Sequence, residues 1–212
     1  MIDHMHTTVW NIFAPVYEWS MRSQKQIYDY IYENAAKTAK DKDVLELATG
    51  PGLIAKNIAN SAKSIIATDF AENMIKTAKK GYCPPNVSFE IADACNLQYD
   101  DNRFDVVIIA SALHIMPNPE KALQEIDRVM KPGGTLIAPN YIFSGKKNLW
   151  QRFLSLIGIK FAHEWTAEQY SAFLSDNGWS ITKSQIVEGR IDLIYVECKK
   201  VDQYKSEAKL FD

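Results

Sequence analysis

The residues best placed to bind a ligand form the segment Glu46 to Gly52, which reads Glu-Leu-Ala-Thr-Gly-Pro-Gly. It follows a short apolar run and precedes apolar residues at helical spacing, which predicts a loop between a strand and a helix. Gly50 and Gly52 allow a ligand to approach the backbone closely, and the helix start at Gly52 presents free N–H groups that favour an anion. A turn that needs glycine for steric reasons, or a nicotinamide-binding loop with Ala55 at its third glycine position, would look similar. The loop alone therefore does not identify its ligand.

Two aspartates, Asp69 and Asp93, stand at the ends of two further expected strands. The carboxyl ends of parallel strands meet at one edge of the sheet, where such sheets bind ligands. Asp69 can accept hydrogen bonds from both ribose hydroxyls of a nucleoside, and Asp93 can accept one from the amino group of adenine. The structural alternatives are a helix N-cap for Asp69 and a solvated strand end for Asp93. Their joint position favours an adenosine site.

A histidine, His114, follows the fourth expected strand. Histidine titrates near neutrality, so His114 could act as a general base, and the alternative is a packing and hydrogen-bonding residue near the ligand. Tyr17, Tyr141 and His163 are further candidates from other parts of the chain. We predict His114 and Tyr17 as the catalytic residues.

Two segments rich in aromatic residues lie outside the regular pattern and are expected to line an acceptor pocket. One is residues 10–19 and the other is residues 141–165; the alternative is that both simply pack on the sheet edge. The predicted acceptor-binding residues are Trp10, Phe13, His114, Tyr141, Trp150 and Phe153. The run 149–157 is also amphipathic with basic residues nearby, so a helix lying on a membrane surface is a further possibility.

The composition is that of an ordinary globular protein, with 212 residues, 47% apolar residues and 24% charged residues. A net charge of −2 argues against a broad nucleic-acid surface. Cys83, Cys95 and Cys198 are scattered and lack metal-site spacing, so we expect no metal, no disulfide framework and a cytoplasmic location. The first residues do not resemble a secretory signal, and no stretch approaches the roughly 20 apolar residues of a membrane span.

Strand and helix patterns alternate from residue 43 onward, which predicts βαβ units and a parallel sheet covered on both faces. The expected strands are 44–48, 64–68, 87–92, 104–110 and 135–139, and the helices between them are 52–62, 71–80 and 119–130. Residues 7–38 read as helical. Thr166 and Gln169 have capping-box spacing before a helix at 167–177. Two strands, 179–187 and 191–199, are joined by a short link, which predicts an antiparallel hairpin.

The expected fold is therefore a three-layer, Rossmann-like α/β domain. It has a seven-stranded, mostly parallel sheet with an antiparallel C-terminal β-hairpin, an N-terminal helical lid and a helical insertion after the fifth strand. The single domain 1–212 divides into an N-terminal cap (1–40), a cofactor-binding core (41–142), an acceptor-side insertion (143–165), the last helix and hairpin (166–200) and a tail (201–212).

The order of these motifs resembles the class I S-adenosylmethionine-dependent methyltransferases. It is most similar to the small-molecule group that contains the ubiquinone/menaquinone C-methyltransferases. The matching segments are residues 13–17 (Phe-Ala-Pro-Val-Tyr), 44–52, 68–74 (Thr-Asp-Phe-Ala-Glu-Asn-Met), 92–94 (Ala-Asp-Ala), 104–107 (Phe-Asp-Val-Val), 113–114 (Leu-His) and 131–134 (Lys-Pro-Gly-Gly).

The resemblance implies roles for matching positions. Glu46, Ala48 and Gly50 would line the methionine part of S-adenosylmethionine, and Tyr17 would close over the site. The full set of implied cofactor contacts is Tyr17, Glu46, Ala48, Thr49, Gly50, Gly52, Asp69, Phe70, Met74, Asp93, Ala94 and Ser111. Phe70 and Met74 are placed beside the adenine. Ala48 departs from the family loop, which usually has glycine there.

We therefore predict a cytoplasmic S-adenosylmethionine-dependent methyltransferase that releases S-adenosylhomocysteine. Its acceptor is expected to be a small apolar or aromatic molecule, methylated by in-line displacement, and the protein a monomer or homodimer. The segment after the fourth strand lacks the Asn/Asp-Pro-Pro-aromatic motif, which argues against adenine or glutamine acceptors. The alternatives are a non-catalytic adenosyl-binding scaffold, a lipid or quinone methyltransferase acting at the membrane surface, and a nicotinamide-dependent oxidoreductase.

Overall fold

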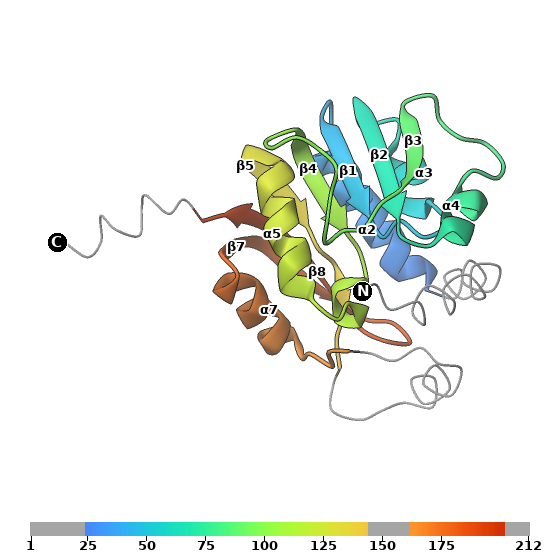
Figure 1. The fold of residues 1–212 in the computed structure, drawn as a ribbon. Coiled ribbons are helices and arrows are strands. Elements are labelled where there is room, and N and C mark those ends of the chain that lie inside the picture. The colour runs from blue at the N-terminus through green and yellow to red at the C-terminus, as the bar shows by residue number, and fades with distance from the viewer. Residues whose placement is uncertain (1–23, 144–161, 202–212) are drawn as a thin grey trace.

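A twisted sheet lies between two layers of helices in the computed structural model, which describes residues 24–143 and 162–201 (Figure 1). The helices are α2 (Lys25–Thr38), α3 (Leu53–Ile58), α4 (Glu72–Ala78), the 3₁₀ turn η1 (Leu113–Ile115), α5 (Pro119–Val129) and α7 (Ala167–Asp176). The strands are β1 (Asp43–Leu47), β2 (Ser64–Asp69), β3 (Val87–Ile91), β4 (Phe104–Ile109), β5 (Met130–Ile137), β6 (Asn140–Tyr141), β7 (Trp179–Val187) and β8 (Leu193–Lys200).

The strand order is β3-β2-β1-β4-β5-β8-β6, with β7 paired to β8. The first five strands are parallel, and β8 is antiparallel to β5, β6 and β7. The predicted α/β fold with its C-terminal hairpin is confirmed. The described sheet has eight strands rather than seven, because Asn140 and Tyr141 pair with Ile194 and Leu193 as a short extra strand.

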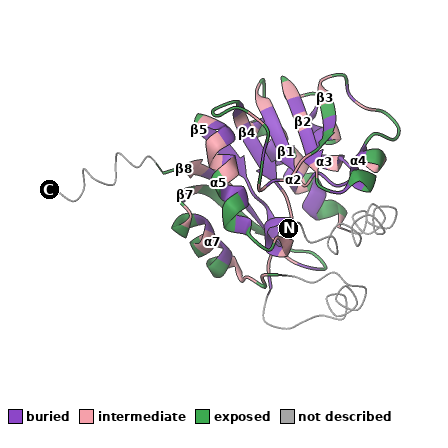
Figure 2. Ribbon diagram, in the orientation of Figure 1, coloured by how far each residue is buried: buried purple, intermediate pink, exposed green. Residues whose placement is uncertain are grey.

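Two apolar clusters fill the spaces between the sheet and its helices, and alternate residues of the central strands supply them. Val44 of β1 belongs to the cluster under α2, α3 and α4, whereas Leu45 and Leu47 belong to the cluster under α5 and α7. Figure 2 shows the central strands buried and the outer faces of α4 and α7 exposed. This two-sided burial explains why the central strands are apolar almost throughout.

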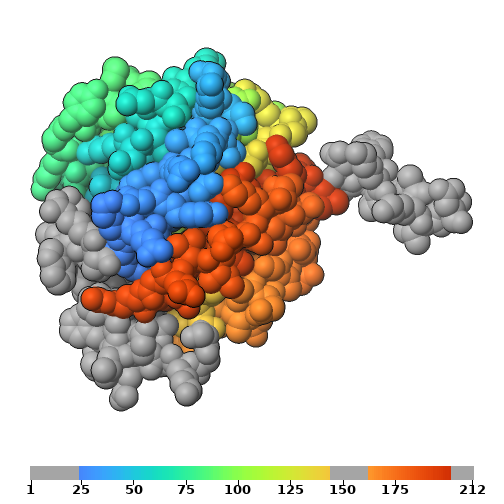
Figure 3. Space-filling model, turned by 180° about the vertical axis from the view of Figure 1, so that it is seen from behind, coloured from blue at the N-terminus to red at the C-terminus, as the bar shows by residue number. Residues whose placement is uncertain are grey.

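Helix α2 lies alongside the β7–β8 hairpin, as Figure 3 shows from behind. Lys183 of β7 donates a hydrogen bond to Asn34 Oδ1 at 2.6 Å, and the Tyr30 ring meets Tyr195 edge-on at 5.4 Å between centroids. The segment expected to form a lid thus continues into a helix fixed to the C-terminal hairpin.

Most element boundaries agree with the expected ones within a few residues. The capping box is present, since Gln169 N–H donates to Thr166 Oγ1 and the Gln169 side chain accepts from Thr166 N–H. Strand β5 begins at Met130, five residues before its expected start at 135, because Met130 pairs with Phe104 ahead of a register shift. Within the described ranges, no helix is long and apolar enough to cross a membrane.

Candidate functional site

The loop after β1 has a left-handed backbone at several positions. Ala48 has φ 52°, Gly50 has φ 56° and Gly52 has φ 77°. The loop is fixed by hydrogen bonds from Thr49 N–H to Thr68 O at 2.8 Å and from Gly52 N–H to Thr49 O at 3.0 Å. A side chain in the left-handed region costs about 1–2 kcal/mol, so Ala48 is a strained residue, and such strain gathers at functional sites.

Gly52 is required by packing. A Cβ atom at this position would lie 2.6 Å from Cε1 of Phe89 and 3.1 Å from the Cβ of Ala78. Gly52 is therefore needed for steric reasons, one of the two explanations that the sequence allowed. A larger residue does not fit, because the start of helix α3 packs against Phe89 of β3. Gly50 instead uses its N–H to bind Asp69.

Asp69 connects two loops at the carboxyl edge of the sheet. Its Oδ2 accepts a hydrogen bond from Gly50 N–H at 2.8 Å, and its Oδ1 accepts one from Ala71 N–H at 2.8 Å. Burial raises the pKa of Asp69, against the opposing effect of these two N–H groups. Each carboxylate oxygen has a second lone pair, so a diol can still bind to a group already aligned by the backbone.

Glu46 and Thr49 bring buried polar atoms to the base of the same loop. Glu46 is only 2% exposed, and by strand alternation it faces α2 and α3 with Val44. Among the described residues, Glu46 Oε2 and Thr49 Oγ1 are buried without a hydrogen-bond partner. Burial raises the pKa of Glu46 to about 8, and the nearby Thr49 hydroxyl and Ala55 N–H, neither of which completes a hydrogen bond to Oε2, oppose the shift only in part.

A buried polar atom without a partner is costly, which indicates that a ligand completes the site. A carboxylate that burial keeps protonated is well suited to a cationic amino group, because the cation stabilises its ionised form. A ligand with an ammonium group and a ribose diol matches Glu46 and Asp69.

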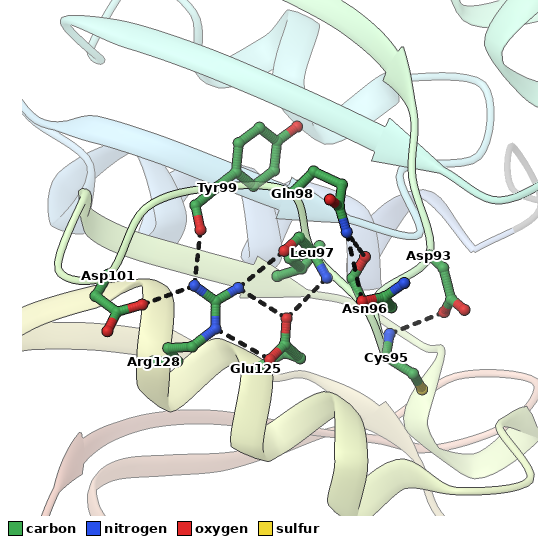
Figure 4. A network of polar contacts seen from close by, with 9 residues as sticks. All are labelled: Asp93, Cys95, Asn96, Leu97, Gln98, Tyr99, Asp101, Glu125 and Arg128. Carbon is green, nitrogen blue, oxygen red and sulfur yellow. Dashed lines mark hydrogen bonds and ion pairs between the residues drawn. The ribbon is translucent and has the colours of Figure 1, made fainter.

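Asp93 forms a turn at the end of β3. Its Oδ1 accepts from Cys95 N–H at 2.8 Å, and its carbonyl oxygen accepts from Asn96 N–H at 2.9 Å (Figure 4). Ala94 is buried, as is Met74 of α4, whereas Phe70 is 37% exposed directly after β2. Phe70 thus follows β2 and Asp93 follows β3, the two strands on the Asp69 side of β1.

His114 lies at the carboxyl ends of β4 and β5, on the other side of the β1 loop. It is 3% exposed, and its Nδ1 is 2.8 Å from Asn140 Oδ1. Asn140 donates its amide N–H to Tyr141 O at 3.2 Å, which assigns Oδ1 as the atom facing the histidine. With the Asn140 amide in this orientation, the matching tautomer of His114 carries its proton on Nδ1 and donates to Oδ1. Burial lowers the pKa of His114 to about 4, so the ring is neutral at physiological pH.

Further polar groups surround this histidine. Tyr141 meets the His114 ring edge-on at 6.0 Å between centroids, and Gln24 Nε2 donates to Tyr141 Oη at 3.1 Å. His163 N–H donates to His114 O at 3.0 Å. In the part of the chain that the structure describes, His163 Nε2 and Gln24 Oε1 are buried without partners. Ser111, just before this cluster, has φ 51°, so a second strained residue lies at the end of β4.

The structure thus gathers the predicted residues 46–52, 69–74, 93–94 and 111–114, with Tyr141, at one edge of the sheet. Five predicted site residues lie outside the described ranges: Trp10, Phe13, Tyr17, Trp150 and Phe153. Sequence reasoning missed Asn140 and Gln24. The sequence signal for Asn140 is a polar residue placed directly after the expected apolar strand 135–139. The structure shows that this asparagine is completely buried.

Several known proteins with sequences similar to this chain are methyltransferases. A family model described as a methyltransferase domain matches residues 45–138. The chain is 31% identical over 183 residues to a demethylmenaquinone methyltransferase of Paenarthrobacter aurescens, covering 76% of this chain and 71% of the relative. It is 30% identical over 163 residues to a ubiquinone/menaquinone biosynthesis C-methyltransferase of Rickettsia prowazekii, covering 66% of each chain.

The fold is similar to solved structures at lower identity. The methyltransferase in a complex with the Trm112 methyltransferase activator of Haloferax volcanii superposes with a TM-score of 0.75 at 17% identity, covering 91% of this chain and 98% of that chain. This likeness supports the α/β architecture alone.

Proposed function

Because the chain belongs to the class I S-adenosylmethionine-dependent methyltransferases of the ubiquinone/menaquinone type, we propose that it methylates a carbon atom of a hydroxylated aromatic ring, such as a reduced naphthoquinone. The observation that carries the proposal is the buried His114, which Asn140 holds at the carboxyl end of β4, the strand next to β1 and its loop. S-adenosylmethionine, the family's cofactor, supplies an electrophilic methyl group on a sulfonium that leaves as a thioether.

The residues around the β1 loop would hold this cofactor by its charged and polar ends. The unpartnered Glu46 Oε2 suits the amino group of the methionine part, and the remaining lone pairs of Asp69 suit the ribose hydroxyls. Asp93 and Ala94 would meet the adenine, with Phe70 and Met74 beside it. The backbone hydrogen bonds that fix these groups before binding reduce the entropy lost on binding.

Among the described residues, His114, Asn140, Tyr141 and Gln24 bring uncharged polar side chains to the acceptor side. A ring carbon attacks a methyl group only if the ring is electron-rich, which a reduced, hydroxylated ring is and a quinone is not. The new carbon–carbon bond forms as the bond from the methyl carbon to sulfur breaks, and the proton of that ring carbon then leaves to water, which restores the aromatic ring. A ring hydroxyl would hydrogen-bond to the neutral imidazole of His114, while Asn140 holds Nδ1 of the ring. This bond increases electron density in the ring, and the low pKa of His114 keeps the nitrogen unprotonated.

The test is methyl transfer to a panel of acceptors, followed by mass spectrometry. The panel contains a reduced short-chain demethylated naphthoquinone, a simple phenol, an amine and a thiol. The proposal predicts carbon methylation of the reduced quinone. Transfer only to the amine or thiol would contradict it.

A matched pair of variants tests the role of His114. In His114→Asn, the amide nitrogen takes the place of Nδ1 and keeps the contact with Asn140, but the distal acceptor is lost. We expect kcat to fall at least about tenfold with little change in the KM for S-adenosylmethionine, the effect of losing one hydrogen bond in the transition state. Full activity of this variant would rule out the proposed role. Asp176→Asn, on the far helix α7, serves as the unchanged control.

A further inference from the structure

The connection from β3 to β4 passes two strands without forming a helix. Strands β2 and β1 lie between β3 and β4 in the sheet, yet the described residues 92–103 contain neither a helix nor a strand. Such a crossover is usually helical, because a helix satisfies its own backbone groups. Here the backbone groups of the connection need partners from elsewhere.

Two side chains of α5 provide those partners (Figure 4). Arg128 donates from Nη1 to Tyr99 O at 2.7 Å and from Nη2 to Leu97 O at 2.9 Å. Glu125 Oε2 accepts from Leu97 N–H at 2.7 Å and also from Arg128 Nη2 at 2.8 Å. Asp101 Oδ1 accepts a further bond from Arg128 Nη1 at 2.8 Å. We call Arg128 and Glu125 the α5 clamp.

The clamp contacts the connection immediately after the predicted adenine-binding turn. Residues 93–96 are closed on themselves by the two hydrogen bonds to Asp93, and the chain then enters Leu97, which is 4% exposed. Leu97 is held on both sides, since its N–H binds Glu125 and its carbonyl binds Arg128. Because the turn at residues 93–96 leads directly into Leu97, the position of Leu97 determines the position of this turn.

We propose that Arg128 and Glu125 are positioning residues for the adenine end of the cofactor site, acting on Asp93 and Ala94 through Leu97. This inference rests on the proposed cofactor site. The planar guanidinium suits the task, because it binds two carbonyl oxygens and two carboxylates at once. A lysine could bind only one of these groups with comparable geometry.

The experiment measures binding of two ligands by calorimetry. S-adenosylhomocysteine carries the adenine amino group, and S-inosylhomocysteine has a carbonyl oxygen in its place. Wild-type protein is expected to prefer the adenosyl ligand, because Asp93 accepts from the amino group. In Arg128→Met the affinity for the adenosyl ligand should fall about tenfold, and the preference between the two ligands should shrink toward unity. Arg128→Lys should restore part of the preference.

The matched control is Asp127→Ala on the same helix, whose carboxylate pairs with Lys200 Nζ at 2.8 Å away from the connection. It should leave both affinities unchanged. If Arg128→Met folds poorly, Glu125→Gln tests the same clamp by weakening the acceptor for Leu97 N–H. A purely structural clamp would lower the unfolding midpoint but leave the ligand preference intact, and that result would overturn the inference. Failure of the wild type to bind the adenosyl ligand would instead contradict the proposed function.

Discussion

Replacement of Glu46 by glutamine should stabilise the ligand-free protein and weaken cofactor binding. Glu46 is buried, and its pKa of about 8 lies far above the ordinary value of 4.5. The folded protein therefore keeps a proton that the unfolded chain releases above pH 4.5. The contribution of the protonated Glu46 carboxyl to the free energy of unfolding is therefore fully present below pH 4.5 and is lost as the pH rises through 8. Glutamine keeps a similar shape but does not titrate.

The magnitude follows from the pKa difference. Between pH 4.5 and pH 8, a one-proton difference changes the free energy of unfolding by about 1.4 kcal/mol per pH unit. From pH 5 to pH 8, wild type should lose roughly 3 to 4 kcal/mol through Glu46 alone. For a domain of this size, that corresponds to a melting-temperature difference on the order of 10 °C.

Urea unfolding at pH 5, 6, 7 and 8 measures this effect directly. The stability difference between Glu46→Gln and wild type should grow with pH, whereas Glu72→Gln, which removes an exposed carboxylate paired with Lys76, should run parallel to wild type. Parallel curves for Glu46→Gln and wild type would refute the reasoning. Calorimetry should show at least about tenfold weaker binding of S-adenosylhomocysteine by the variant, because a charged acceptor for the amino group is lost.

Three further predictions concern the same edge of the sheet. Ala48→Gly should raise the free energy of unfolding by about 1 kcal/mol, since glycine relieves the left-handed strain at φ 52°; an unchanged urea midpoint would contradict this. Gly52→Ala should destabilise by at least about 2 kcal/mol through the clash with Phe89, and Phe89→Leu in the same chain should recover part of the loss, as thermal unfolding can show. The pH profile of kcat should lack a step near pH 6.5, because the pKa of His114 is about 4; a step there that disappears in His114→Asn would count against a neutral histidine.

Local patterns were enough to predict the sheet and to place the candidate site residues at its carboxyl edge. The apolar strands, the glycine loop and the aspartates at strand ends are short-range signals, and the helix cap at Thr166 is a local hydrogen-bond pattern. The extra strand at Asn140 could not be predicted, since two residues pair only because β8 returns beside them. Long-range pairing of this kind is decided by tertiary packing.

The packing contacts and pKa shifts of the site could not be predicted from the sequence either. From the sequence, a loop glycine could be needed either for packing or for the approach of a ligand. The contact of Phe89 with Gly52 assigns the packing role to this glycine. Likewise, a histidine after an apolar strand suggests a base near neutrality, whereas the structure buries His114 against Asn140 and lowers its pKa. The α5 clamp joins residues about thirty positions apart, as in the bond from Arg128 to Leu97, and has no local signature.

Calorimetric titration of the wild-type chain with S-adenosylhomocysteine tests the central claim most directly. We expect one ligand per chain with micromolar affinity. Binding by Asp69→Asn should be weaker, because this variant retains an acceptor for one backbone N–H but loses the charge that receives the ribose hydroxyls. Urea unfolding of the variant would show that its fold is retained. No binding by the folded wild-type protein at millimolar ligand would contradict the account.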